Sequence, residues 1–364
     1  MGSTSALVLA AATAVLPFHI SFTDGRCRRC ETQMLGSIQF SESRVLWAQG
    51  YTPPGGEAGA GEWTLVTSHD GGRSWRELRD SWSHNEGTRA FFFAHGRDGW
   101  IMAPNSLRLG AEPYYASTTD GRRWRTLRVP NSFVDEILYR GGGRGAALAN
   151  DQYKGKSSFF VTEDNGRHWR LKAIGKDMWV DQFTYSDHEA PVLAGCRGHD
   201  TVILASRNGG KSWTRTKIPR LSSTPQTGGC DAQVDGLAFA PGKPGFALVQ
   251  RHTFPLTKAD GYASVWRTVD GGRDWQRVFL DRYPETAKWF DGPYVLGDLT
   301  LVFVKGGTSA SVAYSRDAGQ SWSTASLPTQ LSGCFARGRA LTCTAGSKGF
   351  RVATLTSKPV AGVR

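Results

Sequence analysis

The sequence predicts an all-β protein built from repeated four-stranded antiparallel units, and three observations support this prediction. The 364 residues include 13 Trp and 44 Gly, a composition that suits short strands joined by tight turns. No long segment places apolar residues at helical spacing. A short motif, Ser/Thr-x-Asp-x-Gly-x-x-Trp, recurs six times along the chain, which indicates a repeat architecture.

The six copies of the motif, called boxes below, follow one another at intervals of 50, 44, 44, 62 and 47 residues between their Asp or Asn positions. The second box is one residue shorter than the others, and the fourth has Asn in place of Asp. The paired positions are Asp70 and Trp75, Asp120 and Trp124, Asp164 and Trp169, Asn208 and Trp213, Asp270 and Trp275, and Asp317 and Trp322.

The residue types of the box suit a hairpin turn. An Asp carboxylate accepts hydrogen bonds from the backbone N–H groups of its own turn, and Gly supplies the positive φ that the turn needs. The Trp begins the outgoing strand and buries a large apolar area. We therefore interpret all six boxes as structural.

An apolar hairpin precedes each box, and one more follows the last. We expect these hairpins at Ile38–Gln49, Ala90–Ala103, Val134–Ala149, Val180–Ala194, Val234–Val249, Val295–Val304 and Ser332–Thr344. A hairpin plus a box has the size of a β-propeller blade of four antiparallel strands. Seven hairpins and six boxes favour seven blades, with the missing outer strand supplied by the N-terminal segment near Phe18–Thr23. Six blades with an N-terminal extension is the alternative.

The six motifs resemble the Asp-box (BNR) repeats of sialidases, sortilin-type receptors, some glucanases and photosystem-assembly propellers. The resemblance extends from about Ile38 to the C-terminus and implies a propeller whose boxes lie away from the ligand face. It does not specify an activity, because these families share the box and differ in function.

Two function classes remain open. The arginine triad and the Arg-Ile-Pro segment that the sialidase resemblance would require are not recognisable, and Arg128-Val-Pro130 matches a position of the repeat. A non-catalytic binding or scaffold propeller is therefore the main prediction, and a diverged glycoside hydrolase is the alternative. Neither requires a cofactor.

The charge balance predicts an acidic partner. Lys and Arg together number 44 and Asp and Glu 32, which gives a net charge of +12. Such a balance favours acidic partners such as anionic glycans, cell-wall polymers, lipid head groups or nucleic acid, and a soluble basic surface with no single partner is the alternative. Anionic polysaccharide or a protein partner is the resulting prediction. No Lys/Arg-rich block of the nucleic-acid-binding type is present, and no segment has the length and apolar character of a transmembrane span.

Propeller ligands usually meet the face opposite the boxes, so the loops of that face hold the candidate binding residues. Arginines and aromatic side chains there would clamp and stack on an anionic sugar, whereas ordinary solvated loops are the alternative. The candidates are Trp179, Arg197, His199, Arg251, His252, Arg282 and Trp289.

Three inner strands begin with the same Val-Asp pair, at Asp135, Asp181 and Asp235. In a propeller these carboxylates would surround the mouth of the central channel and bind a cation or sugar hydroxyls, or else cap the strands. Glu136, Asp187, Glu189 and Glu285 are further carboxylates to test for acid–base roles, but sequence spacing gives none of them a partner. No catalytic residue is assigned.

The cysteines predict two disulfides. The segment Cys334–Cys343 reads as a hairpin with a two-residue turn at Gly338-Arg339, which places the two cysteines opposite each other on a non-hydrogen-bonded site. Cα atoms at such a site lie about 4.5 Å apart, a distance that a disulfide accepts. Cys196 and Cys230 belong to loops on the same predicted face. Cys27-x-x-Cys30 stands alone, and with no metal-ligand spacing among the His residues no metal site is predicted.

The disulfides and the N-terminus together predict a location outside the cytoplasm. Residues 1–14 resemble part of a signal peptide that ends at Ala12-Thr13-Ala14, although the charged leading region is missing. We therefore expect one propeller domain over residues 15–364.

Overall fold

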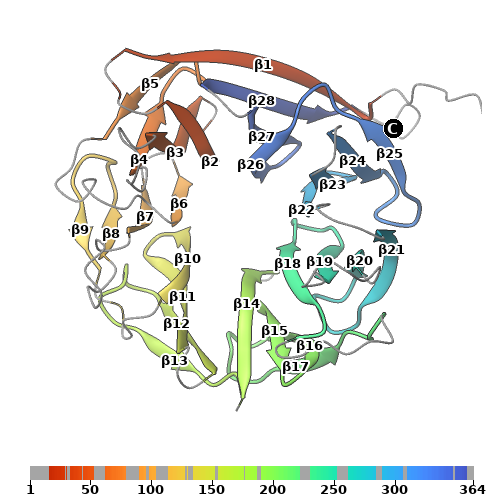
Figure 1. Cartoon of the computed structure of the whole chain (residues 1–364). Helices are drawn as coiled ribbons and strands as arrows, with labels where there is room; N and C mark the ends of the chain where they lie inside the picture. The colour runs from red at the N-terminus through yellow and green to blue at the C-terminus, as the bar shows by residue number, and fades with distance from the viewer. Residues whose placement is uncertain are drawn as a thin grey trace, which may run out of the picture.

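The computed structural model describes residues 16–28, 30, 33–42, 44–52, 62–78, 90–95, 98–103, 114–127, 129, 134–151, 155–175, 177–186, 190–221, 230–251, 261–283, 289–305, 310–346 and 349–358. Among these residues every regular element is a β-strand. The strands form one eight-stranded sheet and five four-stranded sheets. The sheets are arranged radially around a central axis (Figure 1).

Each four-stranded unit runs from an inner strand at the axis to an outer strand at the rim. The inner strands are β2 (Met34–Glu42), β6 (Ala90–His95), β10 (Val134–Gly141), β14 (Met178–Tyr185), β18 (Gln233–Ala238), β22 (Trp289–Leu296) and β26 (Leu331–Arg337). The second strands are β3 (Val45–Thr52), β7 (Asp98–Ala103), β11 (Arg144–Asp151), β15 (Pro191–Arg197), β19 (Gly245–Arg251), β23 (Leu299–Lys305) and β27 (Ala340–Ala345).

The third and fourth strands complete the units. The third strands are β4 (Glu62–Ser68), β8 (Tyr114–Thr118), β12 (Lys156–Thr162), β16 (Asp200–Ala205), β20 (Gly261–Thr268), β24 (Ser311–Ser315) and β28 (Phe350–Ser357). The outer strands are β5 (Ser74–Glu77), β9 (Arg125–Thr126), β13 (Arg170–Lys172), β17 (Thr214–Lys217), β21 (Gln276–Tyr283), β25 (Ser323–Ser326) and β1 (Phe18–Cys27). All of the predicted hairpins pair as expected.

The first strand of the chain closes the ring, which confirms the predicted role of the N-terminal segment. β1 pairs antiparallel with β28 from Phe18 opposite Ser357 to Gly25 opposite Phe350. Its last residues then pair in parallel with β5, so that β1 joins two units into the eight-stranded sheet. Gly25 is required at this junction, because a Cβ there would lie 2.2 Å from the carbonyl oxygen of Gly72.

The hydrophobic core is divided among the interfaces between neighbouring units. One cluster, for example, combines Phe18 of β1 and Leu341 of β27 with Leu301 and Phe303 of β23. Another combines Ile203 of β16 with Val249 of β19, again from two adjacent sheets. Each unit therefore depends on its neighbours to bury its side chains.

The boxes form the turns between third and fourth strands, and their polar atoms bond within the turn. In the first box, Ser68 Oγ donates to Asp70 Oδ1 at 2.8 Å and accepts from the Gly72 N–H at 2.8 Å. Asp70 Oδ1 also accepts from the N–H groups of Arg73 and Ser74, at 3.0 and 2.9 Å. Partial burial opposes ionisation, but the hydrogen bonds from Ser74 and its neighbours hold the pKa of Asp70 at about 2.

The same arrangement recurs in the other boxes. Asn208 accepts from the Ser212 N–H at 2.8 Å as the carboxylates do, which explains why Asn is tolerated in the fourth box. The box Trp side chains pack toward the core, and the indoles of Trp75, Trp275 and Trp322 donate to the Gly carbonyl of their own turn. The boxes thus act as structural turns.

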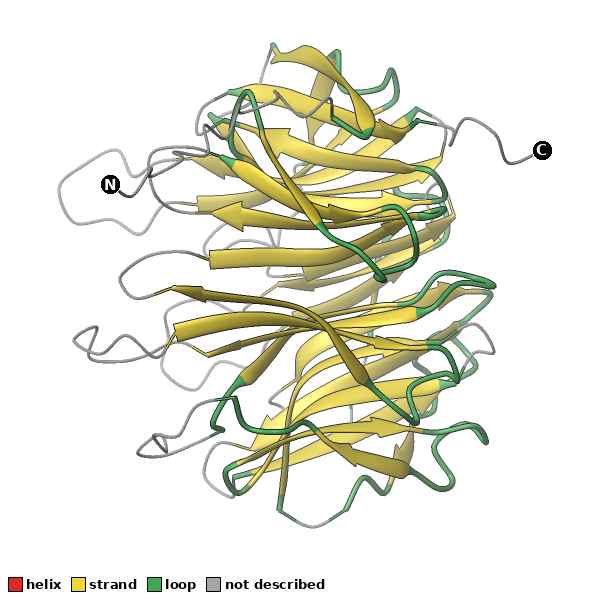
Figure 2. Ribbon diagram, turned by 90° about the vertical axis from the view of Figure 1, so that its right-hand side faces the viewer, coloured by secondary structure: helices red, strands yellow, loops and turns green. Residues whose placement is uncertain are grey.

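Strand direction separates two faces of the ring. Because neighbouring strands within each unit are antiparallel, the box turns share one face with the turns between first and second strands, and we call this the box face. The opposite face holds the turns between second and third strands and the connections that lead into the next unit. Figure 2 shows the strands crossing the ring from one face to the other.

We expect Phe18→Ala to lower the free energy of unfolding by about 3–5 kcal/mol, as the removal of buried aromatic side chains typically does. Phe18 is 1% exposed and belongs to the cluster that closes the ring. Chemical denaturation monitored by tryptophan fluorescence measures the effect. The control is His19→Ala, since His19 is exposed on the same strand. Equal stability of the two variants would contradict a structural role for the β1 closure.

Candidate functional site

The candidate site lies on the opposite face, where the inner strands begin. A β-bulge interrupts the pairing of β10, β14 and β18 immediately after Val134, Val180 and Val234. The bulged residues are Asp135, Asp181 and Asp235, the three aspartates that the sequence singles out. A bulge interrupts the regular alternation of side chains along a strand, which sets Asp181 and Asp235 apart from the strand residues around them.

Hydrogen bonds between neighbouring units hold the start of each of these strands. Tyr115 Oη donates to the carbonyl of Val134 at 3.1 Å, and Asn150 Nδ2 donates to the carbonyl of Val180 at 3.1 Å. Thr201 Oγ1 donates to the carbonyl of Ala232 at 2.5 Å. The second or third strand of one unit therefore fixes the inner strand of the next.

Gln250 makes the most complete of these links. Its side-chain amide donates to the carbonyl of Phe290 at 2.9 Å and accepts from the Phe290 N–H at 3.0 Å. The same amide nitrogen, Gln250 Nε2, also donates to Asp235 Oδ2 at 2.7 Å. Gln250 thus connects the aspartate of β18 to the first residues of β22.

A fourth aspartate, Asp291, follows an apolar residue at the start of β22, and the sequence analysis missed it. Unlike the other three it is paired across the sheet, opposite Phe303, and the irregularity begins after it; Asp291 accepts a hydrogen bond from Tyr294 Oη at 2.8 Å. The sequence pattern that could have identified it is an apolar residue followed by Asp at the start of an inner strand. It was not recognised because Phe stands here in place of the Val of the other three pairs.

Asp181 has the most unusual environment of these carboxylates. Trp179 Nε1 donates to Asp181 Oδ1 at 2.9 Å, while Oδ2 is buried and has no hydrogen-bond partner within the described part of the chain. Burial raises the pKa of Asp181 to about 6; the Trp179 hydrogen bond opposes this rise and the charge of Asp235 adds to it. Near neutral pH this carboxyl group therefore exchanges readily between its acid and ionised forms.

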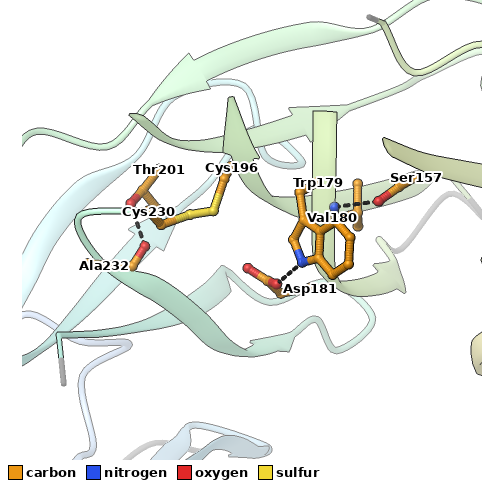
Figure 3. Close-up of a disulfide and its surroundings, with 8 residues drawn as sticks. All are labelled: Ser157, Trp179, Val180, Asp181, Cys196, Thr201, Cys230 and Ala232. Atoms are coloured by element: carbon orange, nitrogen blue, oxygen red, sulfur yellow. Dashed lines mark hydrogen bonds between the residues drawn. A yellow bond between two sulfur atoms is a disulfide. The ribbon is translucent and has the colours of Figure 1, made fainter. Parts of the chain in front are cut away.

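A disulfide borders the Asp181 carboxyl group (Figure 3). Cys196 and Cys230 form a disulfide with their Cα atoms 5.5 Å apart. A carboxylate oxygen of Asp181 and the two sulfurs all lie within 4.8 Å of one another. These are metal-ligating residue types, but the sulfurs are bonded to each other instead. The bridge joins the end of β15 to the connection that enters β18.

The other cysteines are paired as well. Cys334 and Cys343 form the predicted cross-strand pair with Cα atoms 4.1 Å apart, and Phe335 lies opposite Thr342 as the hairpin register requires. Cys27 and Cys30 form a third pair, which the sequence analysis did not assign. All six cysteines of the chain are therefore at disulfide distance.

The remaining candidate residues are distributed around this centre. Arg197 and His199 are exposed at the turn between β15 and β16, beside the disulfide, and Arg251 is buried at the end of β19, next to Gln250. Arg282 lies on the outer strand β21, opposite Tyr262.

For three of the sequence candidates the structure describes the backbone alone. Trp289 opens β22 and Asp135 occupies the β10 bulge, but only their backbones are described, as for Arg282. Glu136 is half-buried in β10. Four sequence candidates lie outside the described ranges, namely His252, Asp187, Glu189 and Glu285.

Comparisons with known proteins show the fold. No protein-family model matches the chain, and no curated protein sequence matches it. Among solved structures, YCF48 bound to D1 peptide has a TM-score of 0.58 at 16% identity, with 95% of this chain and 96% of that chain covered. The chain is a β-propeller.

Other propellers match it at similar levels. The propeller domain of the Trilobed protease from Pyrococcus furiosus has a TM-score of 0.56 at 8% identity and covers 91% of this chain and 95% of that domain. The GH74 xyloglucanase from Xanthomonas campestris has a TM-score of 0.59 at 12% identity over 91% of this chain. The match covers 52% of that enzyme, so this chain spans about half of its length.

We expect the raised pKa of Asp181 to make stability depend on pH. Its folded-state pKa of about 6 lies above the ordinary value of 3.8, so ionisation favours the unfolded state. The stabilisation is complete below about pH 4 and is lost as the pH rises to about 6. Asp181→Asn should remove this loss, so its melting temperature relative to wild type should increase between pH 4 and pH 7.

Thermal melts of both proteins across this pH range provide the measurement. Asp177→Asn is the control, because Asp177 is exposed nearby at a φ of 57°, a conformation that Asn tolerates. A constant difference between Asp181→Asn and wild type at every pH would rule out titration of Asp181 in this range.

Proposed function

We propose that this protein is a non-catalytic binding or scaffold propeller with seven blades and Asp-box repeats, and that it acts outside the cytoplasm. In this proposal residues 15–364 form the propeller and residues 1–14, which lie outside the described ranges, are a signal segment. The ligand face is the one opposite the boxes. The partner is an acidic segment of another protein, with anionic polysaccharide as the alternative ligand.

The match to YCF48 supports a scaffold over an enzyme through the peptide that its structure contains. Coverage alone does not separate the two classes, because this chain and the YCF48 chain cover each other almost completely, and so do this chain and a streptogramin B lyase, at 94% and 98%. The YCF48 structure contains a D1 peptide, so a propeller of this size is compatible with peptide binding. At 16% identity this likeness supports the proposal and specifies no partner.

The cysteines and the charge of the chain also support the proposal. All cysteines are paired, which suits an oxidising compartment, and no described part of the chain forms a helix able to cross a membrane. The net charge of +12 favours an acidic partner. On the opposite face, Arg197 of β15 and Lys156 of β12 are exposed at strand ends in two adjacent sheets, and neither forms an ion pair with another described residue.

A binding screen tests this proposal. The purified protein is incubated with an array of acidic peptides and anionic polysaccharides, and any captured ligand is titrated against the double variant Arg197→Glu/Lys156→Glu. We expect affinity to fall about tenfold or more, because two attractive charges become repulsive. The control Arg122→Glu/Arg167→Glu makes the same charge change on the box face. Equal loss in both variants would contradict the assignment of the ligand face.

A glycoside hydrolase is the second candidate, favoured by the Asp181 and Asp235 pair. A carboxyl group with a pKa near 6 beside a second carboxylate is the combination that glycosidases use as acid and nucleophile or base. Fluorogenic glycosides of several sugar types should then be hydrolysed, with turnover reduced about a hundredfold or more in Asp181→Asn. Turnover that is absent, or unchanged in this variant, rejects the enzyme.

A further inference from the structure

A cavity of about 390 Å³ opens on the box face, between the β14–β17 and β18–β21 sheets. It lies on the face away from the start of the inner strands, and the proposed function does not use it. Its lining includes Arg207, Phe239, Lys243, Val269 and Gly271. Cavities of this volume are of the size that binds small molecules.

The cavity arises where one sheet departs from the repeat. In the first and third units, a two-residue turn between inner and second strands covers the box, and its carbonyl accepts the N–H that follows the box Asp. These bonds are Gly71 N–H to Arg44 at 3.0 Å and Asn165 N–H to Gly143 at 2.7 Å. In the β18–β21 sheet the equivalent connection runs from Phe239 to Pro244 and closes on itself, with Lys243 N–H donating to Ala240 at 3.0 Å.

The N–H that is bound in the first and third boxes makes no such bond to a described residue in the β18–β21 sheet, as is also the case at Gly209 and Ala318 of the fourth and sixth boxes. The equivalent N–H belongs to Gly271, and no described residue accepts a hydrogen bond from it. Gly271 lines the cavity, at a φ of 77° within the box turn. A ligand carbonyl oxygen would satisfy this donor.

One positive charge of the cavity is also uncompensated. Lys243 Nζ is paired with Asp298 Oδ1 at 2.5 Å, which lies outside the lining. Arg207 instead donates Nη2 to the main-chain carbonyl of Asp270 at 2.9 Å and makes no ion pair with a described residue. That bond anchors the guanidinium at the cavity and leaves its other N–H groups for a carboxylate.

The lining also contains the carboxylate of Asp270, which hydrogen bonds of its own turn hold in place. Asp270 Oδ1 accepts from Thr268 Oγ1 at 2.7 Å and from the N–H groups of Arg273 and Asp274, so its own turn engages it. The apolar part of the lining comes from the ring of Phe239 and from Val269, whose side chain is unusually exposed for an apolar residue, at 71%.

We propose that this cavity binds a compact N-acylated amino acid or the C-terminal residue of a peptide. Arg207 binds the carboxylate, the Gly271 N–H donates to the acyl carbonyl, and Phe239 and Val269 contact an apolar side chain. The shared chemistry is a monoanionic carboxylate with an amide carbonyl one residue away. One uncompensated cation, one free amide donor and an apolar wall match these three parts.

The experiment is calorimetric titration of the full chain with N-acetyl-L-phenylalanine, with its neutral amide as the matched ligand. We expect the acid to bind and the amide to bind about tenfold more weakly or not at all, because it lacks the charge that Arg207 recognises. A pentapeptide with C-terminal phenylalanine distinguishes the source: its binding indicates a peptide terminus, and binding of the acid alone indicates a small molecule.

Two variants at exposed positions test the residues without disturbing the core. Arg207→Gln removes the cation and Val269→Glu adds a repelling charge, and each should weaken binding about tenfold or more. The controls are Arg122→Gln, in another box turn, and Leu171→Glu, an apolar side chain that is 63% exposed on β13. No binding of the acid, equal binding of acid and amide, or wild-type affinity in Arg207→Gln would overturn the proposal. A failed array screen on the opposite face would leave it unaffected.

Discussion

The pairing of β1 with β28 is the constraint on which the rest of the structure depends. The hydrophobic clusters of the described residues lie between adjacent units and take residues from both. A first or last unit with an open side would expose apolar surface and an unpaired strand edge. The bonds between Phe18–Gly25 and Phe350–Ser357 remove both defects with a single strand. The two ends of the chain must therefore meet before every interface is complete.

The boxes solve a different problem, which is to end each third strand in a turn that needs no help from its surroundings. The carboxylate, the Ser or Thr hydroxyl and the backbone N–H groups satisfy one another, and the depressed pKa of Asp70 and Asp317 reflects this mutual bonding. Such a turn tolerates changes elsewhere in the blade. It also leaves few polar groups free for a ligand, which agrees with the structural interpretation of the boxes.

The sequence was sufficient to predict the features that repeat or that have local geometry. The hairpins follow from alternating apolar residues, and the Cys334–Cys343 pair follows from a two-residue turn at Gly338-Arg339. The links between units could not be predicted, because Tyr115, Asn150, Thr201 and Gln250 do equivalent work with four different side chains and so leave no repeated signal. The environment of Asp181 was also hidden, since the Cys196–Cys230 bridge and Asp235 come from segments that lie far from Asp181 in sequence.

Both candidate sites arise where the chain departs from its own repeat, for a common physical reason. In the first and third units, a two-residue turn supplies an acceptor for the N–H that follows the box Asp. At Asp181 a bulge places a carboxyl group beside a disulfide, where one oxygen has no donor among the described residues; at Gly271 the box N–H has no acceptor among them. Unsatisfied polar groups at the edge of a rigid scaffold are costly unless water or a ligand completes them. The ring closure and the boxes supply the rigidity, so the irregular positions between them are where selection can introduce binding without disturbing the fold.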